Sequence, residues 1–272
     1  MSTAASLRLQ GVTHAYGLRT VLDGVDLALE AGQVQALVGP SGCGKTTLLH
    51  LCAGLLRCQS GLLHNGFRAP AVMFQQPRLL PWKTTLHNIA LGLKAAGVAR
   101  AERLARARAM ADRVGLDAAA LDQFPHTLSG GMQSRAALAR ALVTEPDLLL
   151  LDEPFSALDI GLKAQLHRLL LAEQRARGLA VLMITHDLME AVRLADQVLV
   201  MASDPGRMVH RFVPCPVAAQ RDDAYVYHTT AELLQVPAVR DAFGLSAAAA
   251  ACRLVRDSNP SAAGGHKKAM AC

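Results

Sequence analysis

The chain is poor in aromatic residues: its 272 residues include one Trp, three Tyr and six Phe. So few rings leave few platforms on which nucleic-acid bases could stack. The formal net charge is +6, but the arginines are scattered among alanines, as in AGVARAERLARARAM, and form no single basic block. We therefore expect an ordinary solvated basic face, and no nucleic acid among the partners.

The sequence also lacks a long apolar run. No stretch approaches the length of about 20 residues that a membrane-spanning helix needs, and the N-terminus MSTAASLRLQGVTHAYG has no apolar core of the kind found in signal peptides. Any membrane role is therefore expected to be peripheral. The longest apolar stretches, PDLLLLDEP and GLAVLMITHD, are short and end in acidic or turn residues, which is typical of buried parallel strands.

No CxxC pair occurs among the six cysteines, and their spacing is irregular. They are Cys43, Cys52, Cys58, Cys215, Cys252 and Cys272. This pattern favours a reduced, cytoplasmic compartment. Apolar residues make up 51% of the chain, which excludes full disorder and is enough to bury one sizeable core.

The order of the expected elements describes an α/β protein. Residues 6–30 predict two or three short antiparallel strands, with turns at Gly17 and at Asp23-Gly24. Further strands are expected at 33–38, 69–76, 147–152, 179–184 and 196–202, and helices from Lys45 to about Gly54, at about 159–177 and at 187–195. Such an alternation predicts a doubly wound sheet with right-handed crossovers.

A helical, arginine-rich segment interrupts this alternation between about residues 77 and 143, with a break at GLDAAALDQFPHTLSGG. The chain after residue 213 is weakly patterned, and we expect a loose solvated tail whose end, RDSNPSAAGGHKKAMAC, is disordered. The sequence thus predicts one domain over residues 1–213 with a helical insert, and a C-terminal extension over 214–272.

Residues 39–46 match the P-loop pattern G-x-x-x-x-G-K-[ST] between an expected strand and an expected helix. Glycines let successive backbone N–H groups turn towards phosphate oxygens, and the following helix adds its positive N-terminal end. In this arrangement Lys45 bridges the β- and γ-phosphates, Thr46 holds Mg²⁺ and Thr47 adds a phosphate contact. The alternative is a glycine-rich turn that merely resembles the motif.

The segment LLLLDEP, residues 148–154, places two carboxylates where an apolar strand ends. Asp152 is positioned to order the water shell of Mg²⁺, and Glu153 to polarise a water for attack on the γ-phosphate. The alternative is that the two carboxylates cap the next helix.

The segment LSGGM, residues 128–132, precedes a helix and predicts an N-cap at Ser129. A capped helix start is also an anion site, so it could meet a γ-phosphate. The chain, however, already carries its own P-loop for that phosphate.

Taken in order, the P-loop, Phe74-Gln75, LSGGM, LLLLDEP, SALD at 156–159 and ITHD at 184–187 resemble the nucleotide-binding ATPase subunit of ABC transporters. The resemblance covers about residues 6–212. It implies an α/β fold: a P-loop NTPase (RecA-like) core with an N-terminal antiparallel β-lobe and an inserted helical subdomain. It also implies ATP and Mg²⁺ as ligands, and a head-to-tail dimer in which each chain closes over the ATP of the other.

The resemblance assigns roles residue by residue. The implied ATP-binding residues are Tyr16, Gly39, Pro40, Ser41, Gly42, Cys43, Gly44, Lys45, Thr46, Thr47, Ser129, Gly130 and Gly131. The implied catalytic residues are Glu153, His186, Gln75 and Lys45, and the implied metal-site residues are Thr46, Gln75 and Asp152. In the implied dimer Ser129 and Gly131 cover the partner's ATP, and Asp159 lies in the loop that links the two sites.

The stretch FQQPRLLPWKTTLHNIALGL, residues 74–93, narrows the resemblance to importers of nitrate, sulfonates, taurine and similar small solutes. It implies integral membrane permease subunits and a periplasmic or surface solute-binding protein as partners, and a peripheral place on the cytoplasmic face of the inner membrane. The implied docking residues are Leu79, Leu80, Pro81 and Trp82. The alternative is that they pack inside the helical lobe.

Three other functions stay open at this point. One is a soluble ABC-type ATPase acting on DNA or ribosomes, although the chain has one cassette and no heptad arm. Another is a P-loop kinase or small GTPase-like switch, which would need neither LSGGM nor ITHD. The third is the ATPase of an exporter or lipoprotein-type transporter, which the LLPW segment disfavours.

Overall fold

The computed structural model describes residues 5–245, and its strands form two sheets. The strands are β1 (Ser6–Tyr16), β2 (Arg19–Glu30), β3 (Val34–Val38), β4 (Ser60–Asn65), β5 (Pro70–Met73), β6 (Leu148–Asp152), β7 (Ala180–Ile184), β8 (Gln197–Ala202) and β9 (Arg207–Phe212). The helices are α1 (Lys45–Cys52), α2 (Thr85–Ile89), α3 (Leu91–Ala95), α4 (Arg100–Arg113), α5 (Ala118–Leu121), α6 (Gly130–Leu142), α7 (Ile160–Arg177), α8 (Leu188–Leu194), α9 (Asp223–Leu233) and α10 (Pro237–Ala242).

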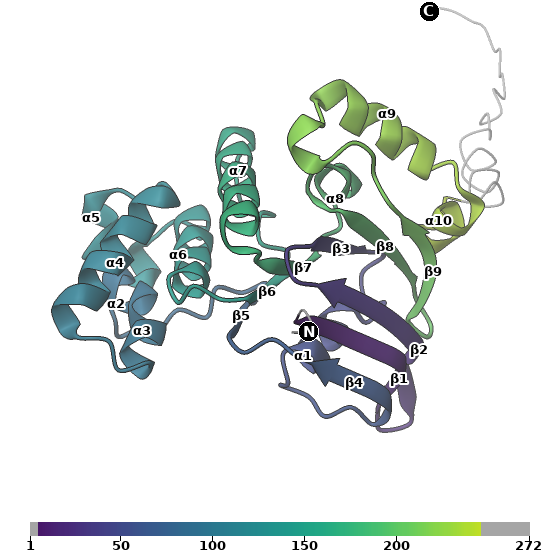
Figure 1. The fold of residues 1–272 in the computed structure, drawn as a ribbon, viewed down its shortest axis with the longest axis horizontal. Helices are drawn as coiled ribbons and strands as arrows, with labels where there is room; N and C mark the ends of the chain where they lie inside the picture. The colour runs from purple at the N-terminus through teal and green to yellow at the C-terminus, as the bar shows by residue number, and fades with distance from the viewer. Residues whose placement is uncertain (1–4, 246–272) are drawn as a thin grey trace, which may run out of the picture.

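The larger sheet has six strands in the order β5-β6-β7-β3-β8-β9, and all neighbours are parallel except β8 and β9. Every residue of β3, β6 and β7 is buried, because both faces of the sheet are covered (Figure 1). Alternate residues face two separate cores, one shared with the helices and one with the smaller sheet and α1. The predicted parallel α/β core is confirmed.

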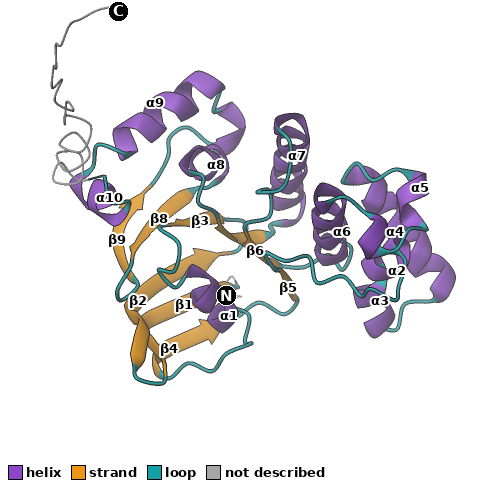
Figure 2. Ribbon diagram, turned by 180° about the vertical axis from the view of Figure 1, so that it is seen from behind, coloured by secondary structure: helices purple, strands orange, loops and turns teal. Residues whose placement is uncertain are grey.

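The smaller sheet is antiparallel, in the order β2-β1-β4, which confirms the predicted N-terminal β-lobe (Figure 2). The turn at Gly17 forms, but the turn expected at Asp23-Gly24 is wrong. Val12 pairs with Val25 and His14 with Leu22, so β2 has an extra residue and the chain continues through a bulge. The left-handed φ of Gly24, +61°, suits such a bulge as well as a turn.

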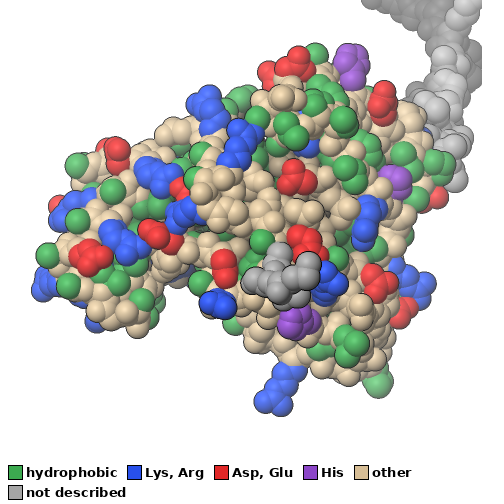
Figure 3. All heavy atoms as spheres, viewed as in Figure 1, with side chains coloured by type: hydrophobic (Ala, Val, Ile, Leu, Met, Phe, Trp, Pro, Cys, Tyr) green, Lys and Arg blue, Asp and Glu red, His purple; other side chains and the backbone are tan. Residues whose placement is uncertain are grey.

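The helical subdomain, α2 to α6, projects away from the sheets (Figures 1 and 2). The predicted break at 115–131 contains the four-residue α5 and a 3-10 turn at Pro125–Thr127. On the face shown in Figure 3, Lys and Arg side chains alternate with Asp and Glu, as an ordinary solvated surface does.

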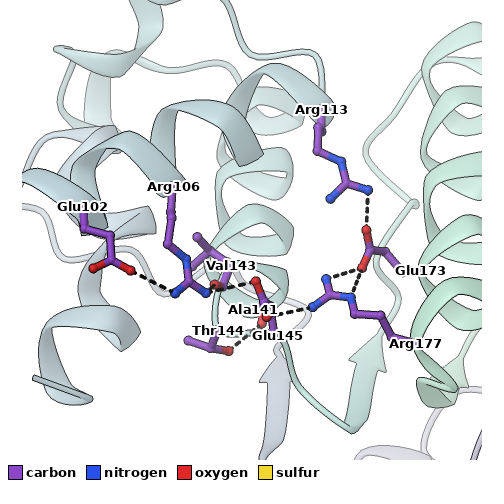
Figure 4. A network of polar contacts seen from close by, with 9 residues as sticks. All are labelled: Glu102, Arg106, Arg113, Ala141, Val143, Thr144, Glu145, Glu173 and Arg177. Atoms are coloured by element: carbon purple, nitrogen blue, oxygen red, sulfur yellow. Dashed lines mark hydrogen bonds and ion pairs between the residues drawn. The ribbon is translucent and has the colours of Figure 1, made fainter. Parts of the chain in front are cut away.

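Ion pairs join this subdomain to α7 of the core (Figure 4). Arg113 of α4 and Arg177 both bond the carboxylate of Glu173, which is 4% exposed. Glu145 accepts from Arg106 at 3.1 Å and pairs with Arg177 at 3.5 Å. Burial alone would raise the pKa of Glu173, but the bonds from Arg113 and Arg177 outweigh it and leave that pKa lowered. The carboxylate is therefore held ionised at the junction.

The first part of the C-terminal extension is folded, so the loose tail expected after residue 213 is wrong for residues 214–245. Helix α9 packs on α8, and α10 packs on β8 and β9. Arg221 is buried and donates to the carbonyl oxygens of Val192 and Ala195, both at 2.7 Å. The predicted disordered end falls in residues 246–272, outside the described residues. Among residues 5–245, no helix has the length and apolar character needed to cross a membrane.

Candidate functional site

A cleft of about 490 Å³ opens where β3, β6 and β7 end. Carboxyl ends of parallel strands share one edge of a sheet, so loops distant in sequence meet there. Of the predicted site residues, the cleft is lined by Tyr16, Ser41, Gly42, Gly44, Lys45, Thr46, Thr47, Gln75, Asp152, Glu153 and His186. Gly39, Pro40 and Cys43 lie in the same loop, and Cys43 is buried.

The glycine loop connects β3 directly to α1. Gly42 and Gly44 have left-handed φ values of +80° and +99°, which L-residues with a side chain rarely adopt. A Cβ on Gly44 would lie 2.7 Å from Leu22 Cδ2, so the loop is also closely packed from behind. In this loop, left-handed glycines alternate with residues that have a side chain. Such an alternation turns successive backbone N–H groups to one side, which makes an anion-binding concavity.

Lys45 begins α1 and is 8% exposed. Its Nζ donates to the carbonyl oxygens of Gly39 at 2.9 Å and Pro40 at 2.8 Å. The loop's own backbone therefore holds the ammonium group at the wall of the cleft. A buried cation with only neutral partners is an attractive neighbour for a polyanion.

Asp152, at the end of β6, is 2% exposed and accepts a hydrogen bond from the Thr46 hydroxyl at 2.9 Å. Burial raises its pKa, partly opposed by the Thr46 bond. Its second oxygen, Oδ1, is buried and has no hydrogen-bond partner among the described residues. The alternative that the acidic pair caps the next helix is wrong for Asp152, because Asp159 caps α7, accepting from Leu162 N at 2.9 Å.

Glu153 follows in a left-handed conformation with φ of +48°, uncommon for a residue with a side chain. Its backbone N–H donates to Ile184 O at 2.9 Å, which ties it to the end of β7. Its carboxylate accepts from Gln75 Nε2 at 3.3 Å and lies 3.4 Å from His186 Nδ1. Two residues from two other loops thus converge on the carboxylate of Glu153.

Ser129, Gly130 and Gly131 do not line this cleft. Ser129 caps α6, and its Oγ accepts from Met132 N at 3.3 Å, so the predicted N-cap forms. Ser129 and Gly130 are exposed, and a Cβ on Gly130 would meet nothing within 4 Å. Within one chain the capped helix start and the cleft remain separate.

Sequence reasoning missed several residues of the cleft. Arg19 and Asp204 both line it and pair at 3.4 Å across distant parts of the chain. His50 of α1 does not line the cleft but packs edge-on against Phe74, and its Nε2 is buried with no hydrogen-bond partner among residues 5–245. His50 is four residues after Thr46, one helical turn further on, so the spacing alone could have suggested it. No pattern in the sequence indicates Asp204.

Comparison with known proteins agrees with this geometry. The ABC transporter family matches residues 22–156. The aliphatic sulfonates import ATP-binding protein SsuB of Corynebacterium glutamicum is 42% identical over 86% of this chain and 95% of its own length. The chain belongs to the ABC transporter family. A P-loop kinase or GTPase-like switch is therefore excluded.

Another similar protein is the taurine import ATP-binding protein TauB of Escherichia coli, 43% identical over 75% of this chain and 83% of its own length. Among solved structures, the dimeric ATP-binding cassette MJ0796 in a post-hydrolysis state with ADP and Pi matches with a TM-score of 0.70 and 27% identity, over 76% of this chain and 98% of that one. A second dimeric structure of MJ0796 matches with a TM-score of 0.71. The predicted P-loop NTPase fold is confirmed, and the chain is an ABC ATPase.

In this ABC ATPase the LLPW segment is divided between packing and exposure. Leu79 packs against the core, and the backbone N–H of Leu80 donates to Asn88 Oδ1 at 2.7 Å. Pro81 is exposed, and Trp82 is 70% exposed. The alternative of buried packing therefore holds in part for the half-buried Leu79 and not for Trp82.

Proposed function

We propose that this chain hydrolyses ATP to power an importer of a small sulfonate-like or taurine-like solute, and that it works as a head-to-tail homodimer. The observation that carries the proposal is the convergence of Lys45, Asp152 and Glu153 on one cleft. The solute class rests on the names of the curated relatives, which are sulfonate and taurine import proteins. The domain that performs this work is proposed to span residues 1–213.

The glycine loop and the start of α1 would hold the phosphates. The residues of this loop other than Pro40 would offer backbone N–H groups, Lys45 would exchange its two carbonyl partners for β- and γ-phosphate oxygens, and Thr47 would add a hydroxyl. Tyr16 is 52% exposed at the other end of the cleft, where its ring can stack on adenine.

Mg²⁺ fits the residues present. The buried Oδ1 of Asp152 has no hydrogen-bond partner in the described part of the chain. The Thr46 hydroxyl donates to the other oxygen of the same carboxylate. These are the hard oxygen donors that Mg²⁺ prefers. Thr46, Asp152 and Gln75 would hold the ion, which when bound neutralises charge on the phosphates.

Glu153 would act as the base that polarises the attacking water. Its carboxylate is partly exposed to the cleft and is aimed by Gln75 and His186. His186 is 65% exposed, so its ring can turn from Glu153 to a γ-phosphate oxygen. The strained backbone of Glu153 fits a residue whose position matters more than local stability.

A second copy of the chain would complete the cleft. Ser129 and Gly130 are exposed at the start of α6, a helix of thirteen residues whose first turn carries no acidic residue. This helix start would face the γ-phosphate of the ATP that is bound in the cleft of the second copy. The helix dipole favours such an anion at the N-terminus. Asp159 would lie between the two clefts.

The permease subunits would dock on Leu79, Leu80, Pro81 and Trp82, with a periplasmic or surface solute-binding protein delivering the solute. An exposed tryptophan beside an exposed proline is the kind of anchor that interfaces use. The chain would then lie on the cytoplasmic face of the inner membrane.

Substitution of Glu153 by Gln tests the catalytic part of the proposal. The amide keeps the shape of the carboxylate but removes the base, so phosphate release should fall by about 100-fold or more, while ATP binding persists. Phosphate release and equilibrium ATP binding would be measured on the same purified chain. Equal rates for the variant and the wild type would remove Glu153 from the role of base.

Substitution of Trp82 by Ala tests the docking part. The side chain is largely exposed, so the isolated chain should keep its thermal stability and its ATP turnover. Its recovery in a pull-down with co-expressed permease subunits should fall by roughly tenfold or more. The matched control is Tyr227→Ala, an exposed aromatic residue on α9. Similar recovery of the Trp82 variant and the wild type would argue against docking there.

A further inference from the structure

The last turn of α6 carries an arginine that bonds the loop containing Gln75. Arg140 Nη1 donates to the carbonyl oxygen of Arg78 at 2.9 Å, and Nη2 donates to that of Pro77 at 2.7 Å. Two donors of one guanidinium thus bind two consecutive carbonyls. Such a planar fork fixes the orientation of its partner as well as the distance.

The bonded loop, which we call the Q-loop segment (residues 74–84), contains neither helix nor strand. Its backbone carbonyls must therefore find partners outside regular structure. Arg78 has a left-handed φ of +44°, and its guanidinium lies 4.1 Å from the centre of the Phe74 ring. Such a backbone conformation persists only where its surroundings hold it, and Arg140 supplies two bonds at that point.

Arg140 has no ion-pair partner within the described residues. Burial lowers its pKa, although a guanidinium remains charged at neutral pH. Its bonds to the two carbonyls are charge-assisted and partly shielded from water, which makes them stronger than neutral bonds. The side-chain bonds of Arg140 within the described residues therefore go to this segment.

These contacts connect two functional ends. Gln75, three residues before Arg78, bonds Glu153 at 3.3 Å. At the other end of α6, Ser129 caps the helix start that is proposed to meet the partner's ATP. A helix of thirteen residues is stiff, so a shift at Ser129 moves Arg140 and, through it, the Q-loop segment.

We propose that Arg140 is a positioning residue that fixes the Q-loop segment to α6, so that Gln75 reaches Glu153 only when α6 is correctly placed. This proposal rests on the ATPase function proposed above. It assigns Arg140 no contact with ATP, and it therefore predicts an effect on turnover with none on ATP affinity.

The test replaces Arg140 by Gln and uses Trp82 as the probe. Trp82 is the only tryptophan of the chain and lies in the Q-loop segment, so its fluorescence anisotropy reports the local motion of that segment. We expect lower anisotropy in Arg140→Gln, a fall in kcat of roughly tenfold or more, and an ATP dissociation constant within about twofold of wild type. Arg140→Lys, which can reach one carbonyl but not both, should lie between the two.

The matched control is Arg103→Gln. Arg103 belongs to the same subdomain, is similarly half-buried and donates to a backbone carbonyl, that of Val98 at 3.2 Å, away from the Q-loop segment. A merely structural loss would lower the melting temperature of both variants alike and leave the Trp82 anisotropy of folded Arg140→Gln unchanged.

The proposal is overturned if Arg140→Gln keeps wild-type anisotropy and kcat, or if ATP affinity falls as much as kcat. Should Arg140→Gln not fold, wild-type values in Arg140→Lys overturn it in the same way. A wild-type chain that binds no ATP or does not hydrolyse it would contradict the proposed function instead. The anisotropy comparison would still decide whether Arg140 holds the segment.

Discussion

At the scale of single residues, the cleft depends on positions that leave no room for a side chain. A Cβ on Gly39 would lie 2.4 Å from Met201 O and 3.0 Å from Cys43 Sγ. The first of these neighbours is backbone of β8, which cannot rotate away. The glycine loop is thus fixed against the sheet as well as open towards the cleft.

Replacing Gly39 by Ala should therefore move the loop. We expect a loss of about 1–3 kcal/mol in the free energy of unfolding, measured by urea denaturation, together with weaker ATP binding. Gly130→Ala is the control, because its Cβ would meet nothing within 4 Å and the monomer should lose no more than about 1 kcal/mol. Equal unfolding curves for the Gly39 variant and the wild type would contradict the packing described here.

The positions of site residues were predictable where the residues that surround them in the structure are also close in sequence. Lys45 and Thr46 begin the helix that follows the strand and the glycine loop, so their place at the wall of the cleft follows from local geometry. The convergence of Gln75 and His186 on Glu153 is different, because it depends on three strands ending side by side. Motif order indicated these residues, but spacing could not give the contacts. Asp204 carries no motif at all and was missed.

At the scale of elements, the fully buried strands were predictable, whereas the edge strands β4 and β9 were not. β6 and β7 are apolar throughout because helices and a second sheet cover both faces. β4 and β9 lie at sheet edges and are at least half-exposed, with polar residues mixed in, so their sequences carry no clear strand pattern. The sequence analysis also missed helix α9. The hydrophobic pattern of α9 is weak on its own, and the helix is stabilised by its packing on α8.

The helical subdomain is joined to α7 of the core by ion pairs around Glu173, so the stability of this junction depends on charge. Glu173 is the acceptor for Arg113 and Arg177, and Glu173→Gln should cost about 2 kcal/mol in unfolding free energy at pH 7. Because the pKa of Glu173 is lowered by folding, its contribution is present above its unfolded pKa and lost as pH falls through the folded pKa.

The difference in melting temperature between wild type and Glu173→Gln should therefore be large at pH 7 and shrink below about pH 4. Glu232→Gln is the control, since Glu232 is exposed on α9, and it should change stability by no more than about 0.5 kcal/mol at either pH. A difference for Glu173→Gln that is the same at both pH values would show that its charge does not matter.

At the scale of the whole molecule, the proposed ATP site is divided between two chains. The cleft of one chain is lined by the glycine loop, Asp152, Glu153, Gln75 and His186, while Ser129 lies outside the cleft at the exposed start of α6. The similar solved cassettes are dimers, one of them with ADP and Pi bound. If the site is divided between two copies, two different inactive variants should restore activity when they are mixed, which a site within a single chain would not allow.

Mixing two inactive variants tests this division most directly. Lys45→Ala removes the phosphate contact of its own cleft, and Ser129→Arg blocks the cleft of the partner, so each alone should release almost no phosphate. In a mixed dimer, one cleft combines both defects and the other combines neither. With random pairing, the mixture should recover about a quarter of the wild-type rate per chain. A mixture as inactive as its components, beside a wild type whose rate per chain does not depend on protein concentration, would contradict a site shared between two chains.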